Sequence, residues 1–297
     1  MRGLAKCAAF IVGVLAVSVV LTPVLHGFLP FPFDKIFNRV RMVAVLVGII
    51  SLGGFRRDTL KRFGMQWTVE SRRFLWTGFV TALPLLVLYT AGEMLAGHAQ
   101  MQLRPLTPLG WAQKLVDALA TGVAVGIAEE FLFRGFVFTS LRDTVFSGRV
   151  RPSVLVTSGV YALIHYLSIR NPPIGPDPGL ADSLRLALTP PRFLGDWQTS
   201  WPSLVGLFLF GVVLTGCAAR TRSLYPSIGL HIGSVFFLRS VKLFSRFQPS
   251  GSMVWGTYRV YDGMVGWVFL VMMGLLSLRV FPETTPGNSG PPVSASG

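Results

Sequence analysis

The sequence predicts an all-α polytopic membrane protein with about eight transmembrane helices, an interfacial basic segment and a long loop rich in proline and glycine. Hydrophobic residues occupy 51% of the 297 positions, charged residues occupy 13%, and the mean hydropathy is +0.57. Soluble domains usually carry about 25% charged residues. A bilayer core about 30 Å thick is crossed by roughly 20 mostly apolar residues, and several such runs follow one another here.

The first 108 residues are expected to form N-terminal spans and a surface segment. Residues 4–25 are a long apolar run without a small-residue cleavage site, so they predict a retained anchor helix. A short span at 41–52 and a further span at 74–95 are expected. The stretch between them, "GGFRRDTLKRFGMQWTVESRR", holds six basic residues among aromatic ones and is typical of a segment on the bilayer surface.

Residues 109–244 are expected to form the membrane core, followed by a loop and a last helix in 245–281. Expected spans in these two parts are 111–138, 154–169, 204–219, 228–242 and 265–280. Residues 171–202 are rich in Pro and Gly, so they predict a re-entrant or surface loop with at most a short helix over 181–188. Residues 282–297 have almost no apolar side chains and are expected to be disordered.

The net charge of +14 comes from Lys and Arg placed between the apolar runs. This pattern favours basic residues flanking a membrane, so a lipid bilayer and not nucleic acid is the expected partner. If the N-terminus is cytoplasmic, the basic loop at 56–73 is cytoplasmic too, as expected in a bacterial inner membrane. Cys7 and Cys217 lie inside apolar runs and predict neither a disulfide nor a CxxC metal site.

Three charged residues interrupt the apolar stretch "AVGIAEEFLFRGFVF" at 124–138. A charge in the hydrocarbon region costs at least ~2.5 kcal/mol, so such residues usually face the bundle interior and serve a function. Glu130 and Arg134 are four apart in a helix and predict an ion pair. Glu129 is rotated by about 100° and has Phe133 one turn on, so its partner is expected on another helix.

Two intramembrane histidines are the candidate partners of Glu129. "SGVYALIHYL" places His165 four residues after Tyr161, and "SIGLHIGSVFF" places His231 at the start of another helix. A carboxylate and an imidazole can take a proton from water, and a second imidazole can donate to the oxyanion of a tetrahedral intermediate. The predicted site is therefore a hydrolytic one.

Other interpretations of these residues remain open. Glu130 and Arg134 suit a purely structural pair, Glu129 can extend toward the helix end, and either histidine alone can be a core residue bonded to a backbone carbonyl. The sequence has no HExxH helix and no pair of intramembrane aspartates. Zinc held by Glu, His and His, with an open position for water, is an alternative that these residues leave open.

Together, "EEFLFRG", "YALIH" and "SLYPSIGLHIGSVFF" resemble the CPBP (CAAX protease and bacteriocin-processing, Abi) family of intramembrane glutamic endopeptidases over residues 109–244. The resemblance implies a glutamate-dependent peptidase that requires no metal or other cofactor, in which Glu129 and His165 activate the attacking water. It also implies that Glu130 and Arg134 orient this pair and that His231 contributes to the oxyanion hole.

The sequence departs from the family pattern at Val235, where family members often have asparagine. Valine has no hydrogen-bond donor, so Ser234 or another group has to replace it if the donor is needed.

The expected function is hydrolysis of a peptide bond in a membrane-associated or lipidated protein or peptide. The alternatives are a non-catalytic membrane binding or immunity protein and a proton-coupled transporter, because intramembrane Glu and His also form proton relays.

Overall fold

The computed structural model describes residues 2–51, 56–165, 174–189, 197–248 and 252–284, and it confirms the prediction of an almost wholly helical protein. Three helical stretches are long and apolar enough to cross a membrane: Val69–Leu95, Ser200–Thr221 and Tyr225–Phe244. Shorter apolar helices accompany them at Val12–His26 and Met264–Val280. The described residues therefore support a polytopic membrane protein, and the predicted number of eight spans is not confirmed.

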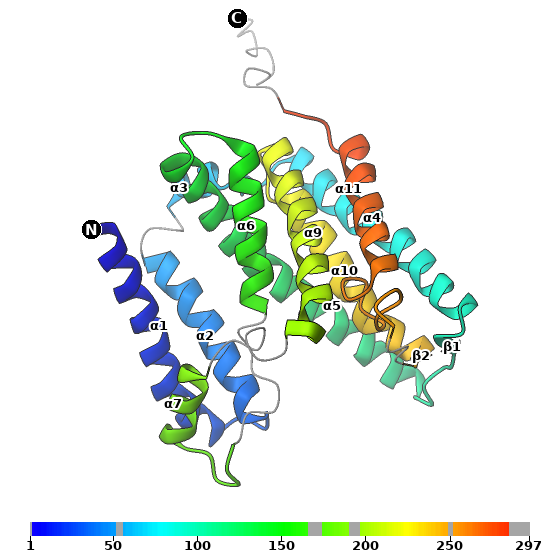
Figure 1. The fold of residues 1–297 in the computed structure, drawn as a ribbon, viewed down its shortest axis with the longest axis horizontal. Coiled ribbons are helices and arrows are strands. Elements are labelled where there is room, and N and C mark those ends of the chain that lie inside the picture. The colour runs from blue at the N-terminus through cyan, green and yellow to red at the C-terminus, as the bar shows by residue number, and fades with distance from the viewer. Residues whose placement is uncertain (1, 52–55, 166–173, 190–196, 249–251, 285–297) are drawn as a thin grey trace, which may run out of the picture.

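The N-terminal helices stand at one side of the bundle. Helix α1 (Arg2–His26) pairs with α2 (Phe33–Ile49), and the short α7 (Leu180–Leu188) lies beside both (Figure 1). Helix α2 begins well before the predicted residue 41, since Pro32 precedes it and Asp34 lies in its first turn. Both residues favour a helix N-terminus, so the helix extends beyond its apolar part.

The basic segment lies at one end of the bundle. It contains α3 (Arg57–Arg62) and the start of α4 (Val69–Leu95). The Thr68 hydroxyl accepts a hydrogen bond of 3.1 Å from the Ser71 amide, which caps α4. Trp67 and Trp76 are exposed, as suits an aromatic belt at a membrane surface.

Helix α10 (Tyr225–Phe244) is the central helix of the core. It packs against α4, α5 (Pro108–Glu130) and α9 (Trp197–Thr221). The approach to α4 is close because Gly229 has no side chain: a Cβ there would overlap the carbonyl oxygen of Leu75. Small residues at helix contacts are typical of membrane bundles, where close backbone packing replaces the hydrophobic effect.

The motif segment changes helix type in the middle. Helix α5 continues directly into a π-helix, η2 (Phe131–Phe138), and a second π-helix, η3 (Leu141–Val145), precedes α6 (Val150–His165). The single span predicted at 111–138 therefore consists of two kinds of helix. Residues 166–169 of the span predicted at 154–169 lie outside the described residues. Wide π turns are rare and frequently occur at functional sites.

The predicted loop at 171–202 is partly wrong. Its short helix is present as α7, but α9 already begins at Trp197 and contains Pro202. Proline near a helix start removes only one amide donor. Packing holds this turn in place, because Trp201 lies against Trp267, whose indole N–H donates to the Pro202 carbonyl with the nitrogen 3.2 Å from the oxygen. Residues 166–173 and 190–196 of this region lie outside the described residues.

The C-terminal elements close the bundle. Helix α11 (Met264–Val280) packs on α9 and α4. Strands β1 (Ala99–Met101) and β2 (Ser245–Phe247) pair antiparallel. They were not predicted, because three-residue strands are too short to show a period. The Thr284 amide donates to the Arg220 carbonyl at 3.1 Å, and the remaining predicted tail lies outside the described residues.

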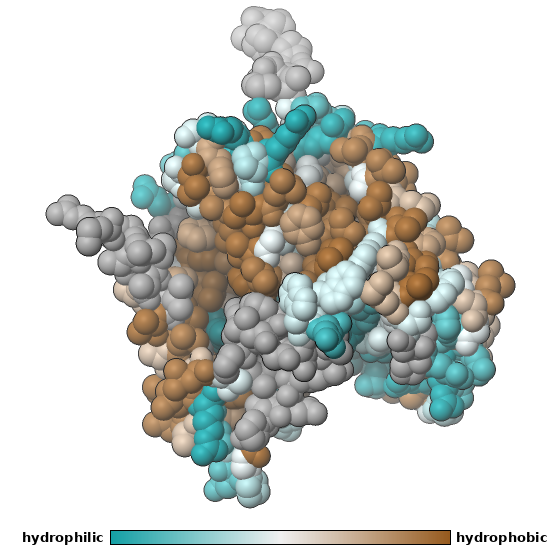
Figure 2. Space-filling model, viewed as in Figure 1, coloured by the Kyte–Doolittle hydropathy of each residue, from teal (hydrophilic) through white to brown (hydrophobic). Residues whose placement is uncertain are grey.

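Apolar side chains form a broad band across the viewed face of the molecule. Figure 2 shows this band below a hydrophilic rim at the end of the bundle that carries α3. Exposed apolar side chains on α11 include Val268, Val271 and Leu275. Such a band is too extensive for a soluble monomer and suits contact with lipid.

Candidate active site

The buried ion pair predicted from the motif is present. Glu130 ends α5 and Arg134 lies in η2, both side chains are 0% exposed, and Arg134 Nη1 is 2.8 Å from Glu130 Oε1. Helix α9 supplies two further acceptors for the guanidinium: Thr215 Oγ1 at 3.1 Å from Nε and the Gly211 carbonyl at 3.4 Å from Nη2. The pair is therefore hydrogen-bonded as well as neutralised, as a buried charge requires.

His231 is held by the same carboxylate. Its Nδ1 lies 2.8 Å from Glu130 Oε1. Because Glu130 is paired with a permanently charged guanidinium, its oxygen accepts and His231 Nδ1 carries the hydrogen. His231 Nε2 consequently points away from Glu130 and toward Glu129, at 3.9 Å from Glu129 Oε2.

Glu129 lies where the two predicted histidines meet. Its side chain is 18% exposed, and its Oε2 is buried without a hydrogen bond from the described residues. That oxygen is 3.6 Å from His165 Nε2 and 3.9 Å from His231 Nε2. The prediction that Glu129 finds its partners on other helices is confirmed.

His165 is the last residue of α6, and its orientation is also fixed. Its Nδ1 lies 2.8 Å from the carbonyl oxygen of Tyr161, and since a carbonyl only accepts, Nδ1 carries the hydrogen. One ring nitrogen of His165 is thus bonded to a backbone carbonyl, as in a histidine with a structural role. The other ring nitrogen faces Glu129, so the structural contact and the predicted contact with Glu129 are both present.

Aromatic side chains wall the site. The Tyr161 ring is 4.4 Å from the His165 ring and 6.5 Å from the His231 ring, and the Arg134 guanidinium carbon lies 4.6 Å from the Tyr161 centroid. Phe210 of α9 also lies beside His231, with ring centroids 5.6 Å apart. An apolar wall of this kind keeps the local dielectric low and strengthens every charge interaction inside it.

Sequence reasoning missed the contribution of α9. Thr215, Gly211 and Phe210 all contact the site, and the only signal was a single polar residue, Thr215, in the apolar run "LFLFGVVLTGC". The suggested replacement donor, Ser234, donates its hydroxyl hydrogen to the Leu230 carbonyl at 2.8 Å. The only hydrogen-bond donor of the Ser234 side chain is therefore already used within its own helix.

The zinc alternative requires several ligands around one point. Among the described residues, no group of three or more His, Cys, Asp or Glu side chains is arranged to hold a metal ion. Glu, His and His are ligand types that zinc accepts, so a chelator is the direct test of whether Glu129, His165 and His231 bind zinc.

Comparison with known families agrees with this geometry. Residues 111–237, from α5 into α10, match the family model described as type II CAAX prenyl endopeptidase, Rce1-like. Neither a curated protein nor a solved structure matches the chain. The match covers 127 of the 297 residues. Together with the apolar helices it supports an integral membrane protein whose matched segment is similar to this endopeptidase family. The matched segment confirms the resemblance to the CAAX protease and bacteriocin-processing family, and it contains all five predicted site residues.

Proposed function

We propose that the chain is a glutamate-dependent intramembrane endopeptidase that cleaves a membrane-associated or lipidated peptide. The single observation that carries this proposal is the buried Glu129 Oε2, which has two imidazole Nε2 atoms within 4 Å and no hydrogen bond from the described residues. The alternatives offered by the sequence, a binding protein or a proton-coupled transporter, require no such convergence on one carboxylate oxygen.

The geometry around Glu129 suits activation of a water molecule. Separations of 3.6 and 3.9 Å are too long for direct hydrogen bonds and fit groups that share one water. His165 Nε2 is free to accept a proton because Nδ1 already donates to Tyr161. Glu129 and His165 can together remove the water proton, and general base catalysis of this kind contributes about 10²- to 10⁴-fold.

The same reasoning gives His231 the role of oxyanion donor. With Nδ1–H bonded to Glu130, Nε2 donates only when the ring is a positively charged imidazolium. The Glu130 carboxylate stabilises that cation, and Arg134 holds the carboxylate in place. A lost oxyanion donor typically costs ~2.7–4 kcal/mol of transition-state stabilisation, so a charged imidazolium can compensate for Val235.

The substrate class follows from the family description and from the bilayer. The matched family is named for CAAX prenyl endopeptidases, so a peptide near a lipidated C-terminus is the proposed substrate. A bacterial inner membrane with a cytoplasmic N-terminus is the proposed setting. The structure supports this orientation, because α1 starts at the same end of the bundle as the basic α3 (Figure 1).

The test compares Glu129→Gln with Glu70→Gln, a change of the same chemistry at an exposed position in the first turn of α4. We expect Glu129→Gln and His165→Ala to abolish cleavage of a farnesylated CAAX-type peptide by the purified, folded protein, whereas Glu70→Gln remains active. Undiminished turnover by Glu129→Gln would rule out the proposal. A chelator should leave turnover unchanged if the water is activated by Glu129 and His165, and should abolish it if a zinc ion activates the water.

A further inference from the structure

A large basic cavity opens at the end of the bundle that carries α3. Its volume is about 1140 Å³, and it lies among α3, η2, the start of α6 and the ends of α9 and α11. Seven of its lining residues are Lys or Arg, whereas its one acidic lining residue is Glu283. The buried Arg134 contributes to its inner wall, so the cavity lies behind the ion pair of the candidate active site.

Several of these positive charges have no internal partner. Asp143 pairs with Arg62 and Arg142 at 2.7 Å each, and Arg220 pairs with Glu283 at 3.4 Å. In the described part of the chain, no carboxylate lies within ion-pair distance of Lys61, Arg151 or Arg222, which are all exposed. The lining charges therefore favour an anion.

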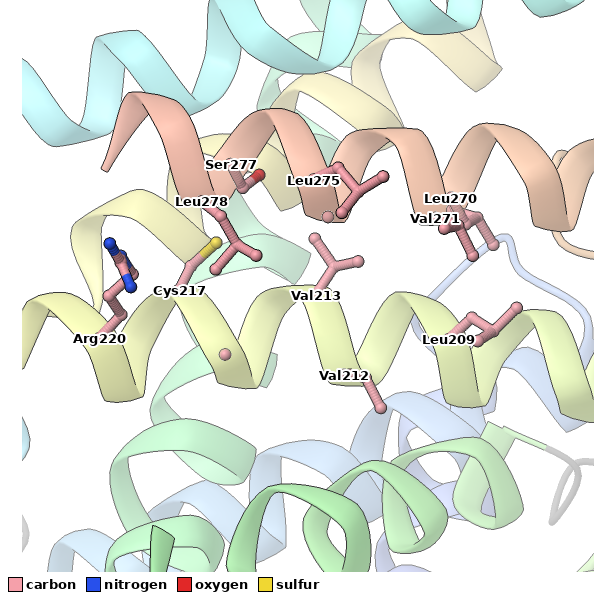
Figure 3. A pocket seen from close by; sticks show the side chains of 12 residues that line it. Leu209, Val212, Val213, Cys217, Arg220, Leu270, Val271, Leu275, Ser277 and Leu278 are labelled. Carbon is pink, nitrogen blue, oxygen red and sulfur yellow. The ribbon is translucent and has the colours of Figure 1, made fainter. Parts of the chain in front are cut away.

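An apolar groove joins this cavity from the lipid-facing side. It lies between α9 and α11, has a volume of about 280 Å³, and shares Gly216, Arg220 and Leu278 with the basic cavity. Figure 3 shows Val213 and Cys217 on α9 facing Leu275 and Leu278 on α11, with Arg220 at one end of the groove.

The groove has the length and the surroundings of a chain-binding site. From Leu209 to Arg220 it follows α9 for twelve residues, which is about 16 Å of helix between the first and the last Cα. Val271 and Leu275, which line it, are 48% and 58% exposed. One cleft thus runs from the hydrocarbon band to a set of positive charges.

We propose that this composite cleft binds an anionic phospholipid. One acyl chain lies in the groove between α9 and α11, and the phosphate lies in the cavity near Lys61, Arg151 and Arg222. A free anion has no apolar part to bury in the groove, and a zwitterionic lipid has no net negative charge to pair with the basic residues of the cavity. The combination selects a ligand that is both amphiphilic and negatively charged.

The groove is tested by filling it at Gly216, where an added Cβ meets no atom within 4 Å, so that the helix tolerates a side chain. Gly159→Leu is the matched control, because Gly159 is also helical, half-buried and open, and lies outside both linings. The full-length protein is titrated with phosphatidylglycerol and observed by native mass spectrometry. In Gly216→Leu the new side chain should displace about two methylene groups of the acyl chain from the groove, which should weaken lipid binding about ten-fold. Lipid binding to Gly159→Leu should not change. Equal affinities in the two variants would overturn the proposal.

The charges are tested by the double variant Lys61→Gln/Arg151→Gln. Each basic residue near an anionic headgroup contributes roughly five-fold, so binding should weaken by about 25-fold. Lys35→Gln/Arg185→Gln removes the same charge from exposed positions outside both linings and should bind as the wild type does.

Two further probes separate the sources of negative charge. Phosphatidylcholine should bind much more weakly than phosphatidylglycerol, and inorganic phosphate should not displace the bound lipid. Equal binding of the two lipids, or displacement by phosphate alone, would contradict the proposal. All of these readouts are independent of peptidase activity and therefore of the proposed function.

Discussion

Breaking the buried ion pair between Glu130 and Arg134 should destabilise the protein more than removing the whole pair. The three variants for this test are Arg134→Met, Glu130→Gln and their combination. Each single change leaves one charge in a site where both side chains are 0% exposed. The combination leaves none, and its glutamine still offers an oxygen to His231 Nδ1.

The expected magnitudes follow from the contacts of the pair. Removing one partner of a buried ion pair costs about 3–5 kcal/mol, because the other charge is left uncompensated. Each remaining group keeps some hydrogen bonds: Glu130 keeps the one from His231, and Arg134 keeps those to Thr215 and Gly211. We therefore expect about 3 kcal/mol for each single variant and roughly 1 kcal/mol for the double variant.

The protein carries its own probe of unfolding. Cys217 is buried beside this site in α9, so in a Cys7→Ser background it is the single thiol. A thiol-reactive fluorophore then reports exposure of Cys217 on heating in detergent at a fixed scan rate. At roughly 2–4 °C per kcal/mol, each single variant should unfold at least about 6 °C below the wild type.

The order of the three midpoints decides the outcome. We expect the double variant to unfold at a higher temperature than either single variant. Its cleavage activity should stay impaired, because the oxygen that faces His231 is no longer charged. Additive losses in the double variant, or single losses below about 1 kcal/mol, would show that the two charges are not coupled as the geometry requires.

Two smaller predictions concern the surroundings of the site. Thr215→Val removes the acceptor of Arg134 Nε and should cost about 1–2 kcal/mol in the same thiol assay, and unchanged stability would contradict a structural role for that bond. The pKa of Asp143 is lowered in the folded protein, chiefly by a hydrogen bond from Arg142. The carboxylate therefore stabilises the fold above about pH 4, where the side chain is ionised in the unfolded chain as well. This stabilisation is lost as the pH falls through the lowered pKa of the folded state. Asp143→Asn should therefore unfold slightly more easily than the wild type at pH 7, by roughly 0.2–1 kcal/mol. The difference should shrink as the pH falls below about 4, and a difference that stays constant in acid would refute this.

The sequence predicted the parts of the site that depend on spacing within one helix or on rare polar residues in apolar runs. The four-residue interval between Glu130 and Arg134 was enough to predict their ion pair. The scarcity of intramembrane histidines was enough to select His165 and His231 as partners of Glu129. Both inferences rest on the high cost of a lone polar group in the hydrocarbon region.

The features that escaped prediction depend on the packing of separate segments. A single threonine in an apolar run gives no sign that it meets Arg134, and glycine and phenylalanine in α9 look like ordinary membrane residues. The continuation of α5 as a π-helix leaves no mark on hydrophobic periodicity. Pro202 indicated a loop, whereas contacts with Trp267 allow α9 to begin before it.

The proposed role of Glu129 as the catalytic carboxylate can be tested without knowing the substrate. Membranes from cells that express the wild type, Glu129→Gln or Glu70→Gln are compared by mass spectrometry for newly formed peptide termini. We expect the same new termini with the wild type and Glu70→Gln, and none of them with Glu129→Gln. Identical termini from the Glu129→Gln membranes would contradict it.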